Sequence, residues 1–197
     1  MRIDKIYIEE FKNLREFSID LNGKHMSTVL LGQNAAGKSN LLEAIVIIFR
    51  DLDLEEQTNF NYSIEYECKG NLLKVDGGPD VKAKFVFYKG QIKDNVISYS
   101  TLVSKTVVKR DKSQYLPKYV FSYYSGISNR LLEHFDRHQT RFYKALLDGI
   151  DTPPRPLFYA RQIHSYFVLM AFYAFSDKKI SEFLEEFLGI VGLESVL

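Results

Sequence analysis

The pattern of apolar and polar residues predicts short strands in the first third of the chain, followed by one long helix. Apolar residues recur in short stretches over 3–8, 17–21 and 27–31, and each stretch is typical of a β-strand. Over 37–50, apolar side chains fall on every face of a helix. We therefore expect a helix there that is buried on most sides.

Residues 60–108 show a different pattern, in which apolar and polar side chains alternate in short runs. Turn sequences rich in glycine separate these runs at 69–71, 76–79 and 89–90. Alternation with a period of two, interrupted by such turns, predicts a meander of antiparallel strands. One further strand is expected over 119–123.

The last third of the chain is predicted to be helical. Amphipathic periodicity covers 130–147, 162–175 and 180–188. The apolar stretch over 165–175 is shorter than the roughly 20 residues that span a bilayer. We therefore expect a buried helix in this stretch and no membrane segment.

Composition narrows the class of protein without identifying its chemistry. The 197 residues include 26 Lys and Arg against 25 Asp and Glu, so no global basic field would attract nucleic acid. The single cysteine, Cys68, cannot form an internal disulfide, and the first residues do not look like an export signal. These features favour a cytoplasmic protein.

The candidate chemistry lies in GQNAAGKS, residues 32–39, which matches G-x-x-x-x-G-K-[ST] between a predicted strand and a predicted helix. Backbone N–H groups of such a loop converge on phosphate oxygens, and the helix N-terminus adds a partial positive charge. Lys38 is expected to reach the β and γ phosphates, and the Ser39 hydroxyl to ligate Mg²⁺. The sequence thus predicts ATP and Mg²⁺ as ligands. The predicted loop residues are Gly32, Gln33, Asn34, Ala35, Ala36, Gly37, Lys38 and Ser39.

The stretch MRIDKIYIEEFKNLREFSIDL, followed by TVLLGQNAAGKSNLLEAIVII, resembles the N-terminal lobe of ABC-type ATPase heads of the SMC and RecF kind. KYVFSYYSGISNRL and LFYARQIHSYFVLMAF are similar to segments of AAA-type ATPases encoded beside bacterial restriction and anti-phage systems. The resemblance implies an α/β P-loop NTPase head lobe with an antiparallel β subdomain and C-terminal helices. The expected parts are a P-loop core over 1–55, the β subdomain over 56–125 and a helical segment over 126–197.

The resemblance also assigns roles outside the loop. Lys12 and Asn13 match an F-[KR]-[NS] turn whose basic residue approaches the phosphates, and Asn40 extends the contacts of the loop. Gln162 is the candidate, beside Lys38, for a catalytic role, as the glutamine that touches Mg²⁺ and the attacking water. A surface helix residue is the alternative interpretation of Gln162. The alternative residues at the position of that glutamine are Ser122 and Ser125.

Ala35 departs from the family pattern, which has glycine at this position. The loop is expected to keep its geometry if Ala35 keeps a negative φ. Glu43, in the stretch NLLEAI, is interpreted as a structural helix residue. His134 and His138 lie four residues apart, but no carboxylate has the spacing of a zinc motif. A local basic cluster is interpreted as a solvated face; it consists of Lys105, Lys109, Arg110, Lys112 and Lys118.

Two parts that ATP hydrolysis needs in this class are missing: the chain has no Asp-Glu dipeptide and no LSGGQ-type signature loop. We therefore expect an incomplete head, the N-terminal half of a larger ATPase that hydrolyses ATP only in its full-length form. The resemblance implies a homodimer or higher oligomer acting as a switch or motor, with DNA and a nuclease or other effector as partners.

Two alternatives stay open, a nucleotide-binding scaffold without hydrolysis and a small P-loop enzyme. The second is disfavoured because no Asn-Lys-x-Asp guanine reader and no arginine-rich lid are found.

Overall fold

The computed structural model describes residues 1–21, 25–94, 96–125, 128–151, 155–175 and 178–192. The chain divides into two compact units. The first comprises Met1–Phe121 and Gly126–Phe158, and the second comprises Ser122–Ser125 and Tyr159–Leu197. The division of the chain at 55 and 125 stays a prediction.

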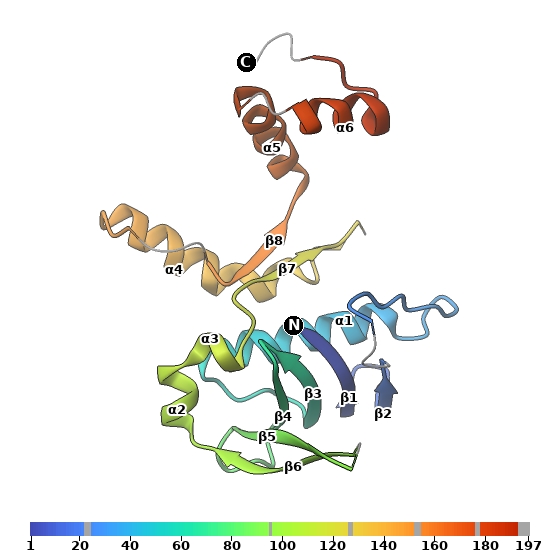
Figure 1. Cartoon of the computed structure of the whole chain (residues 1–197), viewed down its shortest axis with the longest axis vertical. Coiled ribbons are helices and arrows are strands. Elements are labelled where there is room, and N and C mark those ends of the chain that lie inside the picture. The colour runs from blue at the N-terminus through green and yellow to red at the C-terminus, as the bar shows by residue number, and fades with distance from the viewer. Residues whose placement is uncertain (22–24, 95, 126–127, 152–154, 176–177, 193–197) are drawn as a thin grey trace. The chain divides into compact units, whose positions relative to one another are not determined.

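The first unit is built on one six-stranded antiparallel sheet, in the order β2-β1-β3-β4-β5-β6 (Figure 1). Its strands are β1 (Arg2–Phe11), β2 (Leu14–Asp20), β3 (Tyr62–Cys68), β4 (Asn71–Gly77), β5 (Phe85–Lys93) and β6 (Val96–Val103). The predicted meander is therefore confirmed between 62 and 103, whereas the last residues of the predicted range, 105–108, are helical. Because β1 pairs with β3, the opening hairpin and the meander form a single sheet.

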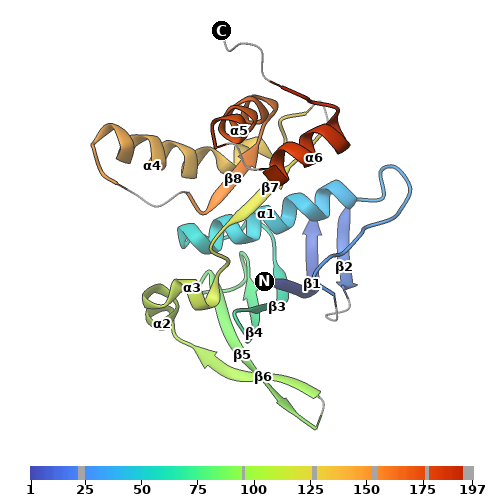
Figure 2. The same cartoon turned by 45° about the horizontal axis from the view of Figure 1, so that its top comes forward.

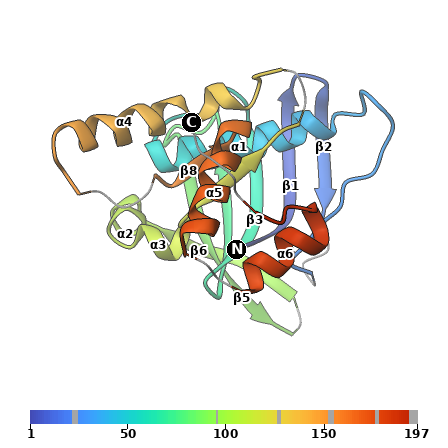
Figure 3. The same ribbon diagram turned by 90° about the horizontal axis from the view of Figure 1, so that it is seen from above.

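Helix α1 (Lys38–Leu54) lies across one face of this sheet (Figures 2 and 3). Side chains alternate between the two faces of a strand, so every second residue of β3 and of most of β4 packs toward the core. The rings of Phe49 on α1 and Tyr66 on β3 meet edge to face, with centroids 5.5 Å apart. The fully buried core also includes Ile6, Ile8, Ala44, Ile48, Ile64, Leu73 and Val75. The predicted burial of α1 on most sides is thus confirmed.

The side of α1 that faces away from the sheet is contacted by a 3₁₀ turn, η1 (Leu132–Phe135), and by the start of helix α4 (Asp136–Leu147) (Figures 1 and 2). Two contacts fix this arrangement: His134 Nε2 lies 3.2 Å from Glu43 Oε1, and His138 Nε2 lies 2.8 Å from Asp53 Oδ2. Helix α1 is therefore sandwiched between the sheet and this segment.

The basic cluster is largely exposed to solvent, as expected, but most of it lies on helices and not on a loop. Four of its residues belong to α2 (Lys105–Arg110) and α3 (Lys112–Tyr115), Lys118 follows α3, and its cations have partners within the chain. Lys112 Nζ lies 2.7 Å from Asp53 Oδ1, and Lys109 Nζ lies 3.4 Å from Glu55 Oε1. In addition, Arg110 pairs with Asp111, Lys105 donates to the Ala83 carbonyl, and Lys118 lies over the Tyr119 ring.

Two local predictions about the strands are wrong. Residues 27–31 are not a strand, and Val29 and Leu31 are 80% and 90% exposed. Apolar composition favours a strand, but a strand also needs a neighbour for its backbone hydrogen bonds, and among the described strands none pairs with this segment. The expected turn at Lys89–Gly90 is instead a register shift inside the β5–β6 pairing.

The chain also contains a two-stranded sheet of β7 (Val120–Tyr123) and β8 (Leu157–Ala160). The second unit carries α5 (Gln162–Phe175) and α6 (Lys178–Leu188), as the periodicity predicted. The expectation that α5 is buried is wrong, because no residue of this helix is buried. Its apolar composition alone did not determine whether another element covers it.

Candidate functional site

Residues 32–39 form a loop that ends at the first turn of α1. Gly37 is the N-cap of the helix, with φ 91° and no side-chain cap. The first N–H groups of a helix lack partners within the helix, so those of α1 are left to face a ligand or water. A Cβ on Gly37 would lie 2.8 Å from Leu14 Cδ2, so both the conformation and the packing require glycine here.

Ala35 adopts a left-handed conformation, with φ 66°. The expectation of a negative φ at this position is therefore wrong. The carbonyl of Ala35 accepts a hydrogen bond from Asn13 Nδ2 at 2.9 Å, and the Ala36 N–H donates to the Gln33 carbonyl at 3.3 Å. These bonds hold the turn against the roughly 1–2 kcal/mol that a left-handed conformation costs a non-glycine residue.

The Lys38 ammonium folds back over the loop that precedes it. Its Nζ donates to the carbonyls of Gly32 and Gln33 at 2.6 and 2.7 Å. A cation is thereby placed at the centre of the loop by backbone oxygens alone. No carboxylate competes for it in these contacts.

The turn between β1 and β2 supports the loop from one side. Asn13 accepts from Asn40 Nδ2 at 2.5 Å through its Oδ1, and it donates to Ala35 as described above. Asn13 therefore links the turn, the loop and the first turn of α1. Lys12, with φ 56°, instead extends its Nζ to the two carboxylate oxygens of Glu43, at 2.6 and 2.7 Å.

Glu43 is the centre of a buried ion cluster beneath the loop. Its side chain is only 5% exposed, yet it accepts from Lys12, from Arg130 Nε at 2.9 Å and from His134 Nε2 at 3.2 Å. Burial raises the pKa of this carboxyl, but hydrogen bonds from Lys12, Arg130 and His134 outweigh it and hold the pKa below its ordinary value. Glu43 is thus ionised, and it joins α1 to the β1–β2 turn and to the η1 segment.

The loop borders a cavity of about 520 Å³ whose charged lining residues are all cationic. These are Lys12, Lys38 and Arg130, and no acidic side chain lines the space. The remaining lining residues are Asn13, Asn34, Ala35, Ala36, Gly37, Ser39 and Asn40. Helix N–H groups and three cations around one cavity are the arrangement that suits a polyanion.

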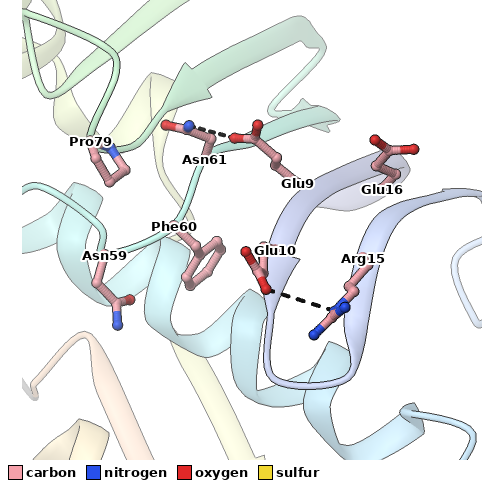
Figure 4. A pocket seen from close by; sticks show the side chains of 8 residues that line it. All are labelled: Glu9, Glu10, Arg15, Glu16, Asn59, Phe60, Asn61 and Pro79. Carbon is pink, nitrogen blue, oxygen red and sulfur yellow. Dashed lines mark hydrogen bonds and ion pairs between the residues drawn. The ribbon is translucent and has the colours of Figure 1, made fainter.

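A larger cavity of about 770 Å³ has a mostly acidic lining (Figure 4). Glu9, Glu10 and Glu16 line it together with a single cation, Arg15, which lies 3.7 Å from Glu10. A phosphate group would be repelled there. The smaller cavity at the loop is therefore the better candidate for an anionic ligand.

The structure brings most of the predicted site residues together. Residues 34–40, with Lys12 and Asn13, all line one cavity, and Gly32 and Gln33 hold Lys38 beside it. Gln162 is the first residue of α5 and belongs to the second unit, as do Ser122 and Ser125. The catalytic role of Gln162 stays a prediction.

Arg130 is a site residue that sequence reasoning missed. It lies 87 positions from Glu43 along the chain, so no local spacing connects the two. His134 and His138 contact different carboxylates, and among the described residues no group of three metal-binding side chains occurs.

Comparison with known families agrees with this architecture. The AAA ATPase domain family matches residues 1–143, well over half of the chain. The chain belongs to this family. A sheet flanked by helices with a glycine-rich loop at a helix start is consistent with such a domain, and membership implies ATP binding. No helix of the described part of the chain has the length and apolar character needed to cross a membrane.

Curated relatives are similar over shorter segments. A protein named DNA replication and repair protein RecF from Rippkaea orientalis is 42% identical over 48 residues, which are 24% of this chain and 12% of that protein. The protein of that name from Chlamydia muridarum is 29% identical over 105 residues, 42% of this chain and 28% of that protein. This chain therefore matches only a minor part of the length of each of these relatives.

Proposed function

We propose that the loop over 32–39 binds the phosphates of ATP together with Mg²⁺. The observation that carries this proposal is the cavity lined by Lys12, Lys38 and Arg130, without an acidic side chain, at the N-terminus of α1. Phosphate oxygens would replace the Gly32 and Gln33 carbonyls as acceptors for Lys38 Nζ. This exchange pairs the ammonium with ionised oxygens in place of neutral ones, which makes the bonds stronger.

The other lining residues have roles that follow from their positions. Ser39, in the first turn of α1, would offer its hydroxyl to Mg²⁺, which when bound neutralises charge on the phosphates. Asn13 and Asn40 keep the loop against the helix through their mutual hydrogen bond. Lys12 adds positive charge while it remains bound to Glu43.

The experiment is a calorimetric titration of the purified chain with ATP and Mg²⁺. The wild-type chain should bind, and Lys38→Ala should lose at least 100-fold in affinity, because the central cation is removed with little loss of packing. Lys109→Ala is the matched control. Lys109 is an exposed lysine of α2 that pairs with Glu55 at the C-terminal end of α1, so its removal should leave the affinity unchanged. Equal affinities of wild type and Lys38→Ala would refute the assignment of the loop.

We further propose that the complete ATPase acts as an ATP-dependent dimerising switch or motor, with DNA or a nuclease effector as partner. Its support is the resemblance to ABC-type heads and the similarity to segments of proteins named for DNA replication and repair. An association with anti-phage defence stays a prediction from the resemblance alone. Light scattering should show that MgATP does not dimerise the present chain, which has no signature loop.

A nucleotide-binding scaffold is the second candidate function. It is favoured by one observation: the cavity lining holds no carboxylate that could polarise an attacking water. Both candidates predict that this chain binds ATP and releases no phosphate. Phosphate release that disappears with Lys38→Ala would contradict both and favour a small P-loop enzyme.

A further inference from the structure

Arg130 lies where the η1 segment meets the loop cavity. Its Nη2 donates to Asn40 Oδ1 and to Glu43 Oε2, and its Nε donates to the same Glu43 oxygen at 2.9 Å. The guanidinium is thus held by two residues of the first turns of α1. The side chain is 25% exposed and lines the cavity beside Lys38 and Ser39.

Some N–H donors of the Arg130 guanidinium are available to a ligand. An arginine carries five N–H donors, and those of Nε and Nη2 are directed to Glu43 and Asn40. Nη1 has no acceptor among the described residues. A planar guanidinium that is fixed on one edge by a carboxylate loses little further side-chain freedom when its other edge binds a phosphate.

We propose that Arg130 is a phosphate-binding residue of this site and that Glu43 is its positioning residue. This inference rests on the proposed binding of ATP at the loop. It gives the site a cation from a segment that no motif links to the loop. The segment also carries His134 and His138, which contact Glu43 and Asp53 on α1.

Phosphate binding by Arg130 would also restrain the segment over 130–138. If the phosphates bind Arg130, they hold the start of this segment to the loop, in addition to the contacts that His134 and His138 make with α1. ATP binding should therefore slow the opening of this segment. Backbone amide exchange measures that opening directly.

The first test compares ATP affinity among variants of the whole chain. Arg130→Ala should weaken MgATP binding at least tenfold, as expected for the loss of a hydrogen bond between charged groups. Arg130→Gln, which keeps a polar side chain but removes the charge and the guanidinium, should show the same loss. Arg137→Ala, an exposed arginine of α4 paired with Glu56, is the control and should bind ATP as the wild type does.

A double variant separates phosphate binding from mere neutralisation of Glu43. Arg130→Ala leaves the buried Glu43 with fewer partners, and this could disturb the loop without any lost phosphate contact. In Arg130→Ala combined with Glu43→Gln that charge is gone, so the affinity should stay at least tenfold below that of the wild type. Recovery to within twofold of the wild type would overturn the proposal.

Hydrogen exchange supplies a second readout. Saturating MgATP should protect amides over 130–138 in the wild type, and this protection should be absent in Arg130→Gln at equal occupancy. Affinity of Arg130→Ala and Arg130→Gln within twofold of the wild type would also overturn the proposal. If the wild type itself does not bind ATP, it is the proposed function that fails, so the two failures are distinguishable.

Discussion

The two ends of α1 both gather cations, but they use them differently. At the C-terminal end, Lys84 Nζ donates to the Glu55 carbonyl at 3.0 Å, and Lys112 Nζ donates to the Asp53 carbonyl at 2.8 Å. At the N-terminal end, Lys12, Lys38 and Arg130 line a cavity that has no acidic wall. The same kind of residue therefore completes the fold at one end and leaves a site for an anion at the other.

The direction of the helix explains this difference. The last carbonyls of a helix are acceptors without partners within it, so lysines near them find neutral oxygens and, here, the carboxylates of Asp53 and Glu55. The first N–H groups are donors, and the cations beside them add to a positive field. Glu43 compensates only part of this field, because it pairs with Lys12 and Arg130, whereas Lys38 contacts neutral carbonyl oxygens. A count of basic residues does not distinguish the two cases, whereas the available acceptors do.

The largest effect expected at the N-terminal end comes from its glycine. Gly37→Ala should lower the free energy of unfolding by about 2 kcal/mol or more, because the left-handed conformation and the contact with Leu14 both exclude a Cβ. Denaturant unfolding measures this, and ATP titration should show weakened binding. Gly32→Ala is the control: its Cβ would lie 3.6 Å from that of Ala36, an ordinary contact. Equal stability of the two variants would contradict the geometry of the loop.

At the C-terminal end, Lys112→Ala should lower the free energy of unfolding by about 1 kcal/mol near neutral pH and leave ATP affinity unchanged. Burial raises the pKa of the Asp53 carboxyl, but hydrogen bonds from His138 and Lys112 outweigh it and lower that pKa. The stabilisation is therefore complete above the ordinary pKa of an aspartate and is lost as pH falls through the lowered value.

The check is chemical denaturation of wild type and Lys112→Ala at neutral and acidic pH. The difference between them should shrink as the pH falls. A difference that grows toward acid would show that the contact with Asp53 is not its source. A change in the ATP affinity of Lys112→Ala would contradict the conclusion that the two ends of α1 have separate roles.

The smallest effect is expected at Ala35. Ala35→Gly removes the cost of the left-handed conformation but adds freedom to the unfolded chain, so the net gain in stability should be about 0.5 kcal/mol. Thermal unfolding would detect it as a slightly higher Tm. A loss of stability would mean that Ala35 does not occupy this conformation in solution.

Local patterns in the sequence were enough for much of the fold. The alternation over 60–108 and the helical periods over 37–50, 162–175 and 180–188 depend on neighbours within a few residues. They correspond to strands between 62 and 103 and to helices over 38–54, 162–175 and 178–188. The loop over 32–39 was found in the same way. Its glycines, lysine and serine all lie within residues 32–39, and the chemistry of the motif depends on their spacing.

Short-range patterns were thus sufficient to predict the type of most elements and the place of the glycine-rich loop before α1. Three features could be seen only in the folded chain: 27–31 pairs with no described strand, Ala35 has a positive φ, and Arg130 reaches Glu43. Burial, strand pairing and ion pairs depend on partners that are distant along the chain. The type of a residue and its spacing from its neighbours indicate what it can bind, and the fold decides which partner it contacts.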